Sequence, residues 1–271
     1  MSEKIIGFFF FLRTIFRHRF VIIQLVKREF HNKYAASLIG FSWAFIQPLT
    51  MIFVMWFAFT YGLRVARIEG DIPFALWLMC GIVPWFFIND TIHSATNSLI
   101  EYSYLIKKSS IKTGSIPIIK LLAAFVVHLF FIVFIMIFAV FYGYYPDVYW
   151  LQLFYYLFCS FILLSGIIWL TSSINVFVRD VSPAISVILS VMFWVTPIIW
   201  PYSMLTGNLK YIALFNPFFY ITEGYRYVFV QKVWFFNNLE MTLFFWVLTL
   251  LVFVTGAYTF KKLKPHFADV L

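Results

Sequence analysis

Charged residues and cysteines are scarce in this sequence of 271 residues. Asp, Glu, Lys and Arg make up 11% of the chain, whereas 63% of the residues are hydrophobic and the mean hydropathy is +0.91. Such a composition excludes an ordinary soluble domain. Cys80 and Cys159 lie far apart in apolar stretches, which favours small buried side chains over a disulfide or a metal site.

Motifs for self-contained chemistry are also missing. The sequence contains no G-x-x-x-x-G-K-[ST] loop, the signature of a nucleotide phosphate site. Its five histidines are scattered, without a pair at metal-ligand spacing. His128 is the one ionisable group predicted deep in an apolar span, whereas ion-coupled transporters and membrane transferases place acidic or basic groups there. We therefore expect no catalytic residue, no metal site and no cofactor bound by this chain.

Apolar stretches long enough to cross a bilayer recur along the chain. They predict an all-α membrane protein with six transmembrane helices, at residues 38–63, 74–93, 117–142, 151–174, 181–200 and 241–260. No linker rich in Ser, Gly or Pro divides the sequence, which indicates a single transmembrane domain over residues 1–271.

The basic residues predict how the protein is oriented. With the N-terminus inside, 15 of the 20 Lys and Arg residues face the cytoplasm, and the outer side keeps Arg64, Arg67, Lys210, Arg226 and Lys232. This bias predicts that both termini are cytoplasmic. The formal charge of +9 then reflects membrane topology, so a nucleic-acid partner is not needed to explain it.

Two amphipathic segments are predicted on the cytoplasmic side. In residues 16–34, apolar residues recur every three or four positions and basic residues, including Arg28 and Lys33, take the other face. This pattern is typical of a helix along the inner leaflet, and both an anchoring role and a role in docking a partner fit it. The polar loop at 94–117 is longer than a helical hairpin needs, and its apolar spacing predicts a short helix that contacts a cytosolic protein.

The segment that follows span five is too broken by prolines to cross the bilayer, yet it is long enough to enter and return. Irregular backbone is costly in lipid unless it is buried in protein or lines a path, so a re-entrant helical hairpin between spans five and six points to transport. Glu223 and Arg226 are one helical turn apart. They either pair within the hairpin as part of a gate or form a local surface pair with no gating role.

Small polar residues recur every four positions in span five, at Ser182, Ser186 and Ser190, and Trp194 continues the spacing. Two interpretations fit this stripe and the small residues of span four. One is close helix packing, and the other is a path for a hydroxyl-rich substrate with ring faces for sugars. For such a path the candidate channel residues are Trp43, Gln47, Trp56, Ser186, Ser190, Phe193, Trp194 and Trp200.

Six stretches, taken in order, resemble one family. They are LVKREFHNKYAASLIGFSWAFIQPL at 25–49, PFALWLMCGIVPWFF at 73–87, NVFVRDV at 175–181, TPIIWP at 196–201, NPFFYITEGYR at 216–226 and KKLKPHFADVL at 261–271. In these stretches the chain is similar to the membrane subunit of the ATP-binding-cassette exporters of lipid-linked polysaccharides, which include the O-antigen, wall-teichoic-acid and capsular polysaccharide permeases.

The resemblance implies specific elements and partners. It implies an interface helix at 16–34, a coupling helix at 101–113, a further cytoplasmic contact at Arg179-Asp180 and two re-entrant gate helices at 203–213 and 217–230. Two copies of the chain would form a homodimer around a channel, and each would engage one cytosolic ATPase subunit that carries ATP and magnesium. After the coupling helix the chain reads IKTGSIP, where related sequences often have a short basic run and Phe-Pro, which leaves the details of ATPase docking open.

The same resemblance assigns roles to residues. The ATPase-coupling residues would be Glu101, Tyr102, Tyr104, Leu105, Lys107, Lys108, Arg179 and Asp180; the gate residues Asn216, Pro217, Tyr220, Glu223 and Arg226; and the residues at the lipid head group Arg28 and Lys33.

The expected function is that of a permease subunit in the bacterial cytoplasmic (inner) membrane. It would export a polysaccharide linked to a carrier of undecaprenyl-pyrophosphate type, with O-antigen the first candidate and wall teichoic acid the second. The chain would not be an enzyme, because ATP hydrolysis would reside on the partner. Two alternatives stay open: an ABC permease for a small substrate, and a membrane transferase acting on lipid-linked sugars.

Overall fold

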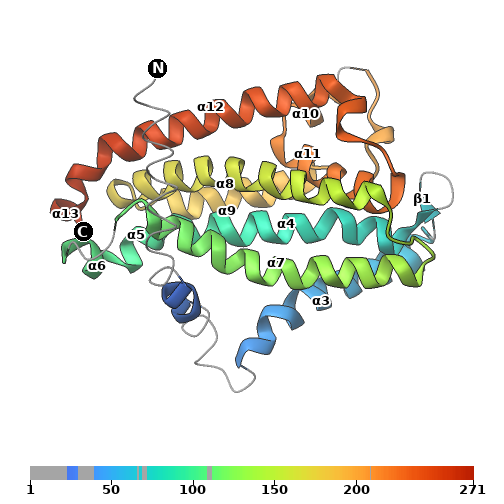
Figure 1. Ribbon diagram of the computed structural model, residues 1–271, viewed down its shortest axis with the longest axis horizontal. Coiled ribbons are helices and arrows are strands. Elements are labelled where there is room, and N and C mark those ends of the chain that lie inside the picture. Colours follow the sequence, from blue (N-terminus) through green and yellow to red (C-terminus); the bar gives the residue numbers. More distant parts are fainter. Residues whose placement is uncertain (1–22, 30–39, 66, 69–71, 109–111, 208) are drawn as a thin grey trace.

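The computed structural model shows a bundle of long helices that share one axis (Figure 1). The structure describes residues 23–29, 40–65, 67–68, 72–108, 112–207 and 209–271. Within these ranges, five helical stretches are long and apolar enough to cross a membrane. The protein is therefore a mainly helical, multi-pass membrane protein.

Five of the six predicted spans coincide with long helices. These are α3 (Trp43–Phe57), preceded by η1 (Gly40–Ser42) and continued by the π-helical turn η2 (Ala58–Gly62); α4 (Phe74–Thr96); α7 (Ser115–Phe141); α8 (Gln152–Phe177), preceded by η3 (Val148–Leu151); and α12 (Leu239–Leu263). Their ends lie within a few residues of the bounds expected from the sequence.

The predicted fifth span is the exception. α9 (Val181–Val195) has 15 residues. At 1.5 Å per residue it is about 22 Å long, which is less than the roughly 30 Å of a hydrocarbon core. It ends at Val195 and not at Trp200, because Pro197 restricts the preceding Thr196 to an extended backbone, with a ψ of 131°.

One end of the bundle, called the α6 end, collects several short helices (Figure 1). They are α5 (Ser98–Glu101), α6 (Ser103–Lys107), η7 (Lys264–His266) and α13 (Phe267–Val270). Where a single helix is predicted over 101–113, the described residues form two short helices, separated at Tyr102, where the backbone leaves the α region and the side chain is buried. Residues 109–111 of the predicted helix lie outside the described residues. Residues 23–29 are helical, whereas 16–22 and 30–34 of the predicted interface helix lie outside the described residues.

The opposite end, called the β1 end, carries a small hairpin and the segment before α12. Strands β1 (Arg67–Ile68) and β2 (Ile72–Pro73) pair antiparallel, with Arg67 opposite Pro73 and Ile68 opposite Ile72. The helical elements here are η4 (Tyr202–Met204), α10 (Leu209–Leu214), α11 (Pro217–Arg226), the π-helical turn η5 (Tyr227–Gln231) and η6 (Phe235–Asn238).

The first predicted gate helix is shorter than expected. α10 begins at Leu209 and not near residue 203, because Leu205 is extended and Gly207 has a φ of +56°, a conformation that favours glycine and ends helical geometry. The second predicted gate helix coincides with α11 and η5, with bounds that differ by one residue at the C-terminal end.

The core centres on α4, in which 83% of the most apolar stretch is buried. α4 lies between α7 and α8 along most of its length, and α11 packs on it near the β1 end (Figure 1). Small residues bring α8 and α12 together, since a Cβ atom on Gly256 would lie 2.1 Å from the carbonyl oxygen of Gly166. Gly166, in the predicted fourth span, therefore serves close helix packing and does not line a substrate path.

Candidate functional site

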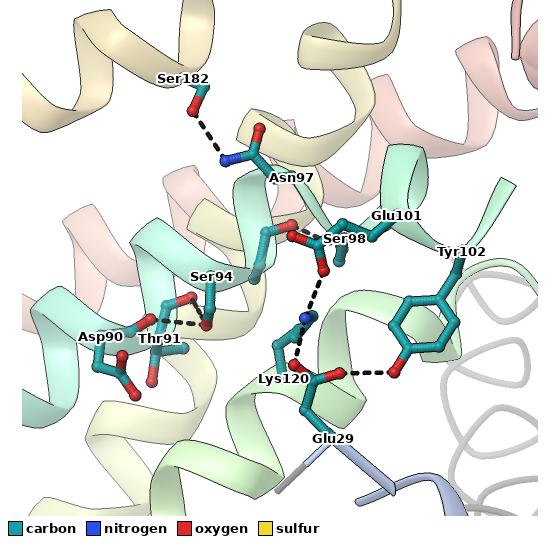
Figure 2. Close-up of polar contacts among 11 residues, drawn as sticks. Glu29, Asp90, Thr91, Ser94, Asn97, Ser98, Glu101, Tyr102, Lys120 and Ser182 are labelled. Atoms are coloured by element: carbon teal, nitrogen blue, oxygen red, sulfur yellow. Dashed lines mark hydrogen bonds and ion pairs between the residues drawn. The ribbon is translucent and has the colours of Figure 1, made fainter. Parts of the chain in front are cut away.

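A buried ion cluster lies at the α6 end, where α4 gives way to α5 (Figure 2). Lys120 of α7 is 5% exposed and forms ion pairs with Glu29 of the N-terminal helical segment and with Glu101 of α5. The Nζ atom of Lys120 lies 2.6 Å from Oε2 of Glu101. Tyr102 donates its hydroxyl hydrogen to Oε2 of Glu29 at 2.5 Å. One buried cation thus joins three segments that are distant in the sequence.

The charge of Lys120 is compensated inside the protein. Taking an ammonium group out of water costs several kcal/mol, and attraction to carboxylates in a less polar medium offsets that cost. The side chain of Glu29 is 11% exposed and that of Glu101 is 50% exposed, so Glu29 is the buried partner. Burial, followed by the hydrogen bond to Glu29, raises the pKa of Tyr102, so the phenol stays protonated and keeps its donor role.

A hydrogen-bond network on the other side of the α4–α5 junction reaches α8 and α9. Asn97 follows α4 and donates from Nδ2 to Oγ of Ser182, in the first turn of α9, at 2.9 Å (Figure 2). Asn175 of α8 donates to Oδ1 of Asn97 and to the Thr96 carbonyl, both at 3.1 Å, and accepts the backbone N–H of Ser182 at 3.1 Å. Asn175 is 1% exposed, whereas Asn97 and Ser182 are partly buried, so the network is shielded from water most completely at Asn175.

A second polar cluster lies on α11, at the β1 end. Arg226 is fully buried and donates to Oε2 of Glu223 and to the Pro197 carbonyl, both at 2.8 Å, and to the Ile198 carbonyl at 2.9 Å. Its guanidinium group lies 3.6 Å from the ring centroid of Trp77 in α4. The expected Glu223–Arg226 pair is confirmed, and the alternative of a surface pair is wrong because both side chains are buried.

Arg226 is also not the outer loop residue that the basic-residue pattern suggests. Gly81 of α4 makes room for it, since a Cβ atom there would lie 2.7 Å from Nη2 of Arg226. Asn216 begins α11 by accepting the N–H of Phe218 at 3.0 Å, and its Nδ2 donates to Oγ1 of Thr196 at 2.6 Å. α11 is thereby attached to both α4 and the end of α9.

The remaining gate residues attach α11 to the helices on its other side. Pro217 occupies the first turn of α11. Backbone N–H groups there have no acceptor within the helix, so the absence of an N–H in proline costs no helical hydrogen bond. The hydroxyl of Tyr220 lies 2.9 Å from that of Tyr155 in α8 and 3.0 Å from that of Thr242 in α12. The predicted gate residues are therefore brought together by the structure, in the interior of the β1 end.

The predicted channel residues lie on α3, on α9 and, for Trp200, in the segment that follows α9. Trp43, Gln47, Ser190 and Trp194 are exposed, whereas Trp56, Ser186, Phe193 and Trp200 are partly buried. On α9, an open groove runs along Ser186, Val187, Ser190, Val191 and Trp194. Ser190 donates to the Ser186 carbonyl at 2.8 Å, and Oγ of Ser186 lies 2.7 Å from Nε2 of His93, so hydroxyl groups border an apolar surface.

The predicted ATPase-coupling residues gather at the α6 end. Glu101, Tyr104, Lys107, Lys108, Arg179 and Asp180 are exposed, Leu105 is partly buried and Tyr102 is buried. Arg28 is exposed, with its guanidinium carbon 6.0 Å from the centroid of the Tyr104 ring, and Lys33 lies outside the described residues. Exposed residues of α5, α6 and the turn before α9 therefore share one end of the molecule.

The sequence patterns did not predict the contacts of Lys120, Glu29, Asn97 or Asn175. Two signals were available. Lys120 is the charged residue of an otherwise apolar helix, and Glu29 is an acidic residue in a basic segment. In the part of the chain that the structure describes, no group of three His, Cys, Asp or Glu side chains could hold a metal ion.

Comparison with known proteins assigns this arrangement to a family. Residues 21–230 match the family described as ABC-2 type transporter. The chain belongs to that family. It is 26% identical over 256 residues to a protein named O-antigen export system permease protein RfbA from Klebsiella pneumoniae, a match that covers 93% of this chain and 95% of that protein. A protein of the same name from Myxococcus xanthus is 25% identical over 235 residues, which cover 81% of this chain and 84% of that protein.

Membership in the ABC-2 type transporter family fits the composition and the fold. It identifies this multi-pass membrane protein as a transport subunit and not as an enzyme. It also implies an ATP-binding-cassette ATPase as the partner, in agreement with the expectation from the sequence motifs.

Proposed function

We propose that the chain is the permease subunit of an ATP-driven exporter of lipid-linked polysaccharide, with O-antigen as the first candidate substrate and wall teichoic acid as the second. The observation that carries this proposal is the likeness, over most of the chain, to proteins named O-antigen export permeases. The proposed carrier is a lipid of undecaprenyl-pyrophosphate type, and the proposed location is the bacterial cytoplasmic membrane.

In the proposed transporter two copies of the chain face each other through α3 and α9. The uncovered faces of these helices support this arrangement: 17% of the most apolar part of Gly40–Gly62 is buried, and Val187 and Trp194 of α9 are 64% and 63% exposed. Aromatic rings offer sugar rings a surface, and the hydroxyl groups of Ser186 and Ser190 offer hydrogen-bonding partners to a substrate that cannot enter hydrocarbon.

The proposed topology places the α6 end and both termini in the cytosol. α9 and the residues up to Trp200 provide the fifth crossing of six, and α10 and α11 form a re-entrant hairpin that closes the outer end of the path. Arg28 and Lys33 attract the anionic head group of the lipid carrier. The exposed residues of α5 and α6, together with Arg179 and Asp180, contact the ATPase.

The proposed mechanism begins when ATP binding draws two ATPase subunits together. α5, α6 and the N-terminal helical segment receive this movement, and the walls formed by α3 and α9 separate. The pyrophosphate head group enters from the inner leaflet, and the glycan follows between the two copies. ATP and magnesium remain on the partner subunits throughout.

The test is co-purification of the tagged chain with the ATPase encoded beside it, followed by measurement of ATP hydrolysis in lipid vesicles. A complex of two permease and two ATPase chains, with hydrolysis stimulated by lipid-linked glycan and not by the lipid carrier alone, is the expected result. Failure to bind the ATPase, or equal stimulation by unrelated small substrates, would overturn the proposal.

A further inference from the structure

α9 is attached to the bundle by few buried side chains. Among its 15 residues, all of which the structure describes, Leu189 alone is buried. Apolar contacts are non-directional, and so small a buried surface leaves a helix able to shift against its neighbours unless other bonds fix it. Ile185, Met192 and Phe193 add partly buried contacts with the core, and the polar bonds at the two ends of α9 add directional constraints to this small apolar contact.

At its N-terminal end α9 is bonded to the α4–α5 junction and to α8. Oδ1 of Asn175 accepts the N–H of Ser182, one of the donors that the first turn of a helix leaves without a helical partner. The hydroxyl of Ser182 accepts from Asn97, and one turn later Ser186 contacts His93 of α4. Asn175 is buried, Asn97 and Ser182 are partly buried, and the Ser186–His93 contact is exposed, so the bonds of Asn175 are the ones most shielded from water.

At its other end α9 is bonded to α11. Arg226 donates to the carbonyls of Pro197 and Ile198, which lie just beyond the helix, and Asn216 donates to Thr196. The prolines prevent these backbone groups from continuing the helical pattern, so the polar side chains of α11 satisfy them where lipid could not. α9 is thus held at two points, one at each end of the bundle.

The junction that holds the first turn of α9 also belongs to the ion cluster. The backbone N–H of Glu101 donates to the Asn97 carbonyl at 3.1 Å, so both residues lie on one helical turn. Glu101 pairs with Lys120, and Lys120 pairs with Glu29. A displacement of α5 therefore acts on α9 through Asn97 and on the N-terminal segment through Glu101.

We propose that Asn97, Asn175 and Ser182 form a closed polar clasp that transmits the movement of α5 and α6 to α9, with Asn175 as its positioning residue. This inference rests on the proposed function, in which α5 and α6 meet the ATPase and α9 lines the path. The clasp stays closed throughout the transport cycle. The bonds from Arg226 hold the far end of α9, so movement at the junction tilts the helix instead of sliding it.

The first experiment compares Asn175→Ala with the wild type in the complete permease–ATPase complex, reconstituted in lipid vesicles. The probe is undecaprenyl-pyrophosphate-linked glycan extracted from the strain that encodes the chain, and the readout is glycan moved per ATP hydrolysed. Ser173→Ala is the matched control, because it also removes a side-chain hydrogen bond of α8, one that Ser173 makes to the Leu170 carbonyl of its own helix.

We expect Asn175→Ala to hydrolyse ATP within about twofold of the wild type without glycan, and to move at least tenfold less glycan per ATP. Ser173→Ala keeps the wild-type ratio. A residue with only a structural role would lower the amount of complex and leave the ratio unchanged. An Asn175→Ala complex with the wild-type ratio therefore overturns the clasp.

A second experiment decides the matter even if Asn175→Ala fails to assemble. Asn97→Cys and Ser182→Cys are introduced together, with Cys80 and Cys159 replaced by Ala, and the two new thiols are joined by a short bifunctional reagent. The clasp predicts a low ratio of glycan to ATP before cross-linking and a higher ratio after it, because a covalent bond replaces the lost hydrogen bonds. If the ratio of glycan to ATP stays low or falls further after cross-linking, Asn97 and Ser182 do not form a rigid connection, and the clasp is overturned.

These experiments distinguish a failure of the proposed function from a failure of the clasp. If the wild-type complex does not bind the ATPase or move glycan, the proposed function itself fails. If the wild type exports glycan and the cross-link does not restore the coupling ratio, the proposed function stands and the clasp alone is wrong.

Discussion

α4 and α9 are both apolar helices, yet they are held in the protein in different ways. α4 buries 83% of its most apolar stretch, including the whole side chains of Leu76, Trp77 and Leu78. α9 buries Leu189; the Ser182 N–H at its start donates to Asn175, and Arg226 donates to the Pro197 carbonyl just beyond its end. Hydropathy places a helix in the membrane, but the neighbours of that helix, whether protein, lipid or a substrate path, decide how much of it is buried.

The largest loss of stability is expected from removing Arg226, the buried cation that joins α4 to the end of α9. Arg226→Met leaves Glu223 without its charge partner and two carbonyls without donors, a change that costs about 3–5 kcal/mol in a buried pair. The melting temperature in detergent should fall by roughly 10 °C for a chain of this size. α9 should lose protection from proteolysis at its C-terminal end.

A double variant separates lost charge pairing from lost shape. Arg226→Met combined with Glu223→Gln removes both charges, so it should recover a clear part of the lost melting temperature. Arg179→Met, an exposed arginine at the other end, should melt as the wild type does. Equal melting of the single and double variants would contradict the assignment of a buried ion pair.

Close helix packing is tested at the contact of α8 and α12. Gly256→Leu places side-chain atoms where the Gly166 carbonyl now lies, and overpacking of this kind costs about 1–3 kcal/mol or more. Thermal melting in detergent should show the loss. Gly62→Ala is the control, since a Cβ atom there meets nothing within 4 Å, and its melting should not change.

The ion cluster should give a smaller effect on stability and a visible effect on function. Lys120→Met leaves Glu29 buried without a cation, but Glu101 is half exposed and can be hydrated, so we expect a loss of about 2 kcal/mol. Hydrolysis by the bound ATPase should respond less to glycan. Lys112→Met, an exposed lysine nearby, is the control, and Lys120→Met with Glu29→Gln should recover part of the stability.

The smallest effect on stability is expected on the open face of α9. Trp194 is 63% exposed, so Trp194→Ala should change the free energy of unfolding by less than about 0.5 kcal/mol. Glycan export should nevertheless fall severalfold. A large loss of stability with normal export would place Trp194 in packing and not on the path.

The long helices could be predicted from the sequence because a chain in lipid must satisfy its own backbone hydrogen bonds, and a helix of apolar residues does so. The end of α9 could not be placed in the same way. Hydropathy stays high through Ile198 and Ile199, whereas the helix ends at Val195 because Pro197 changes the backbone conformation of its neighbour. Hydropathy does not reveal this change of backbone conformation.

The candidate site could be predicted only in part. Glu223 and Arg226 are three residues apart, so helical spacing was enough to pair them. Glu29 and Lys120 are 91 residues apart, and Asn97 and Ser182 are 85 apart, so only the fold brings them together. Sequence patterns report local periodicity, and contacts between distant helices depend on packing that no local pattern describes.

The most direct test of the proposed pairing of two copies is cross-linking between them through the open face of α9. Single cysteines are placed at Val187 or Val191, with Cys80 and Cys159 replaced by Ala, and matched cysteines are placed at Val247 or Val254 on the exposed face of α12. In membranes that contain the ATPase, we expect copy-to-copy cross-links from α9 and none from α12. Cross-links from α12 with none from α9 would contradict the proposed pairing.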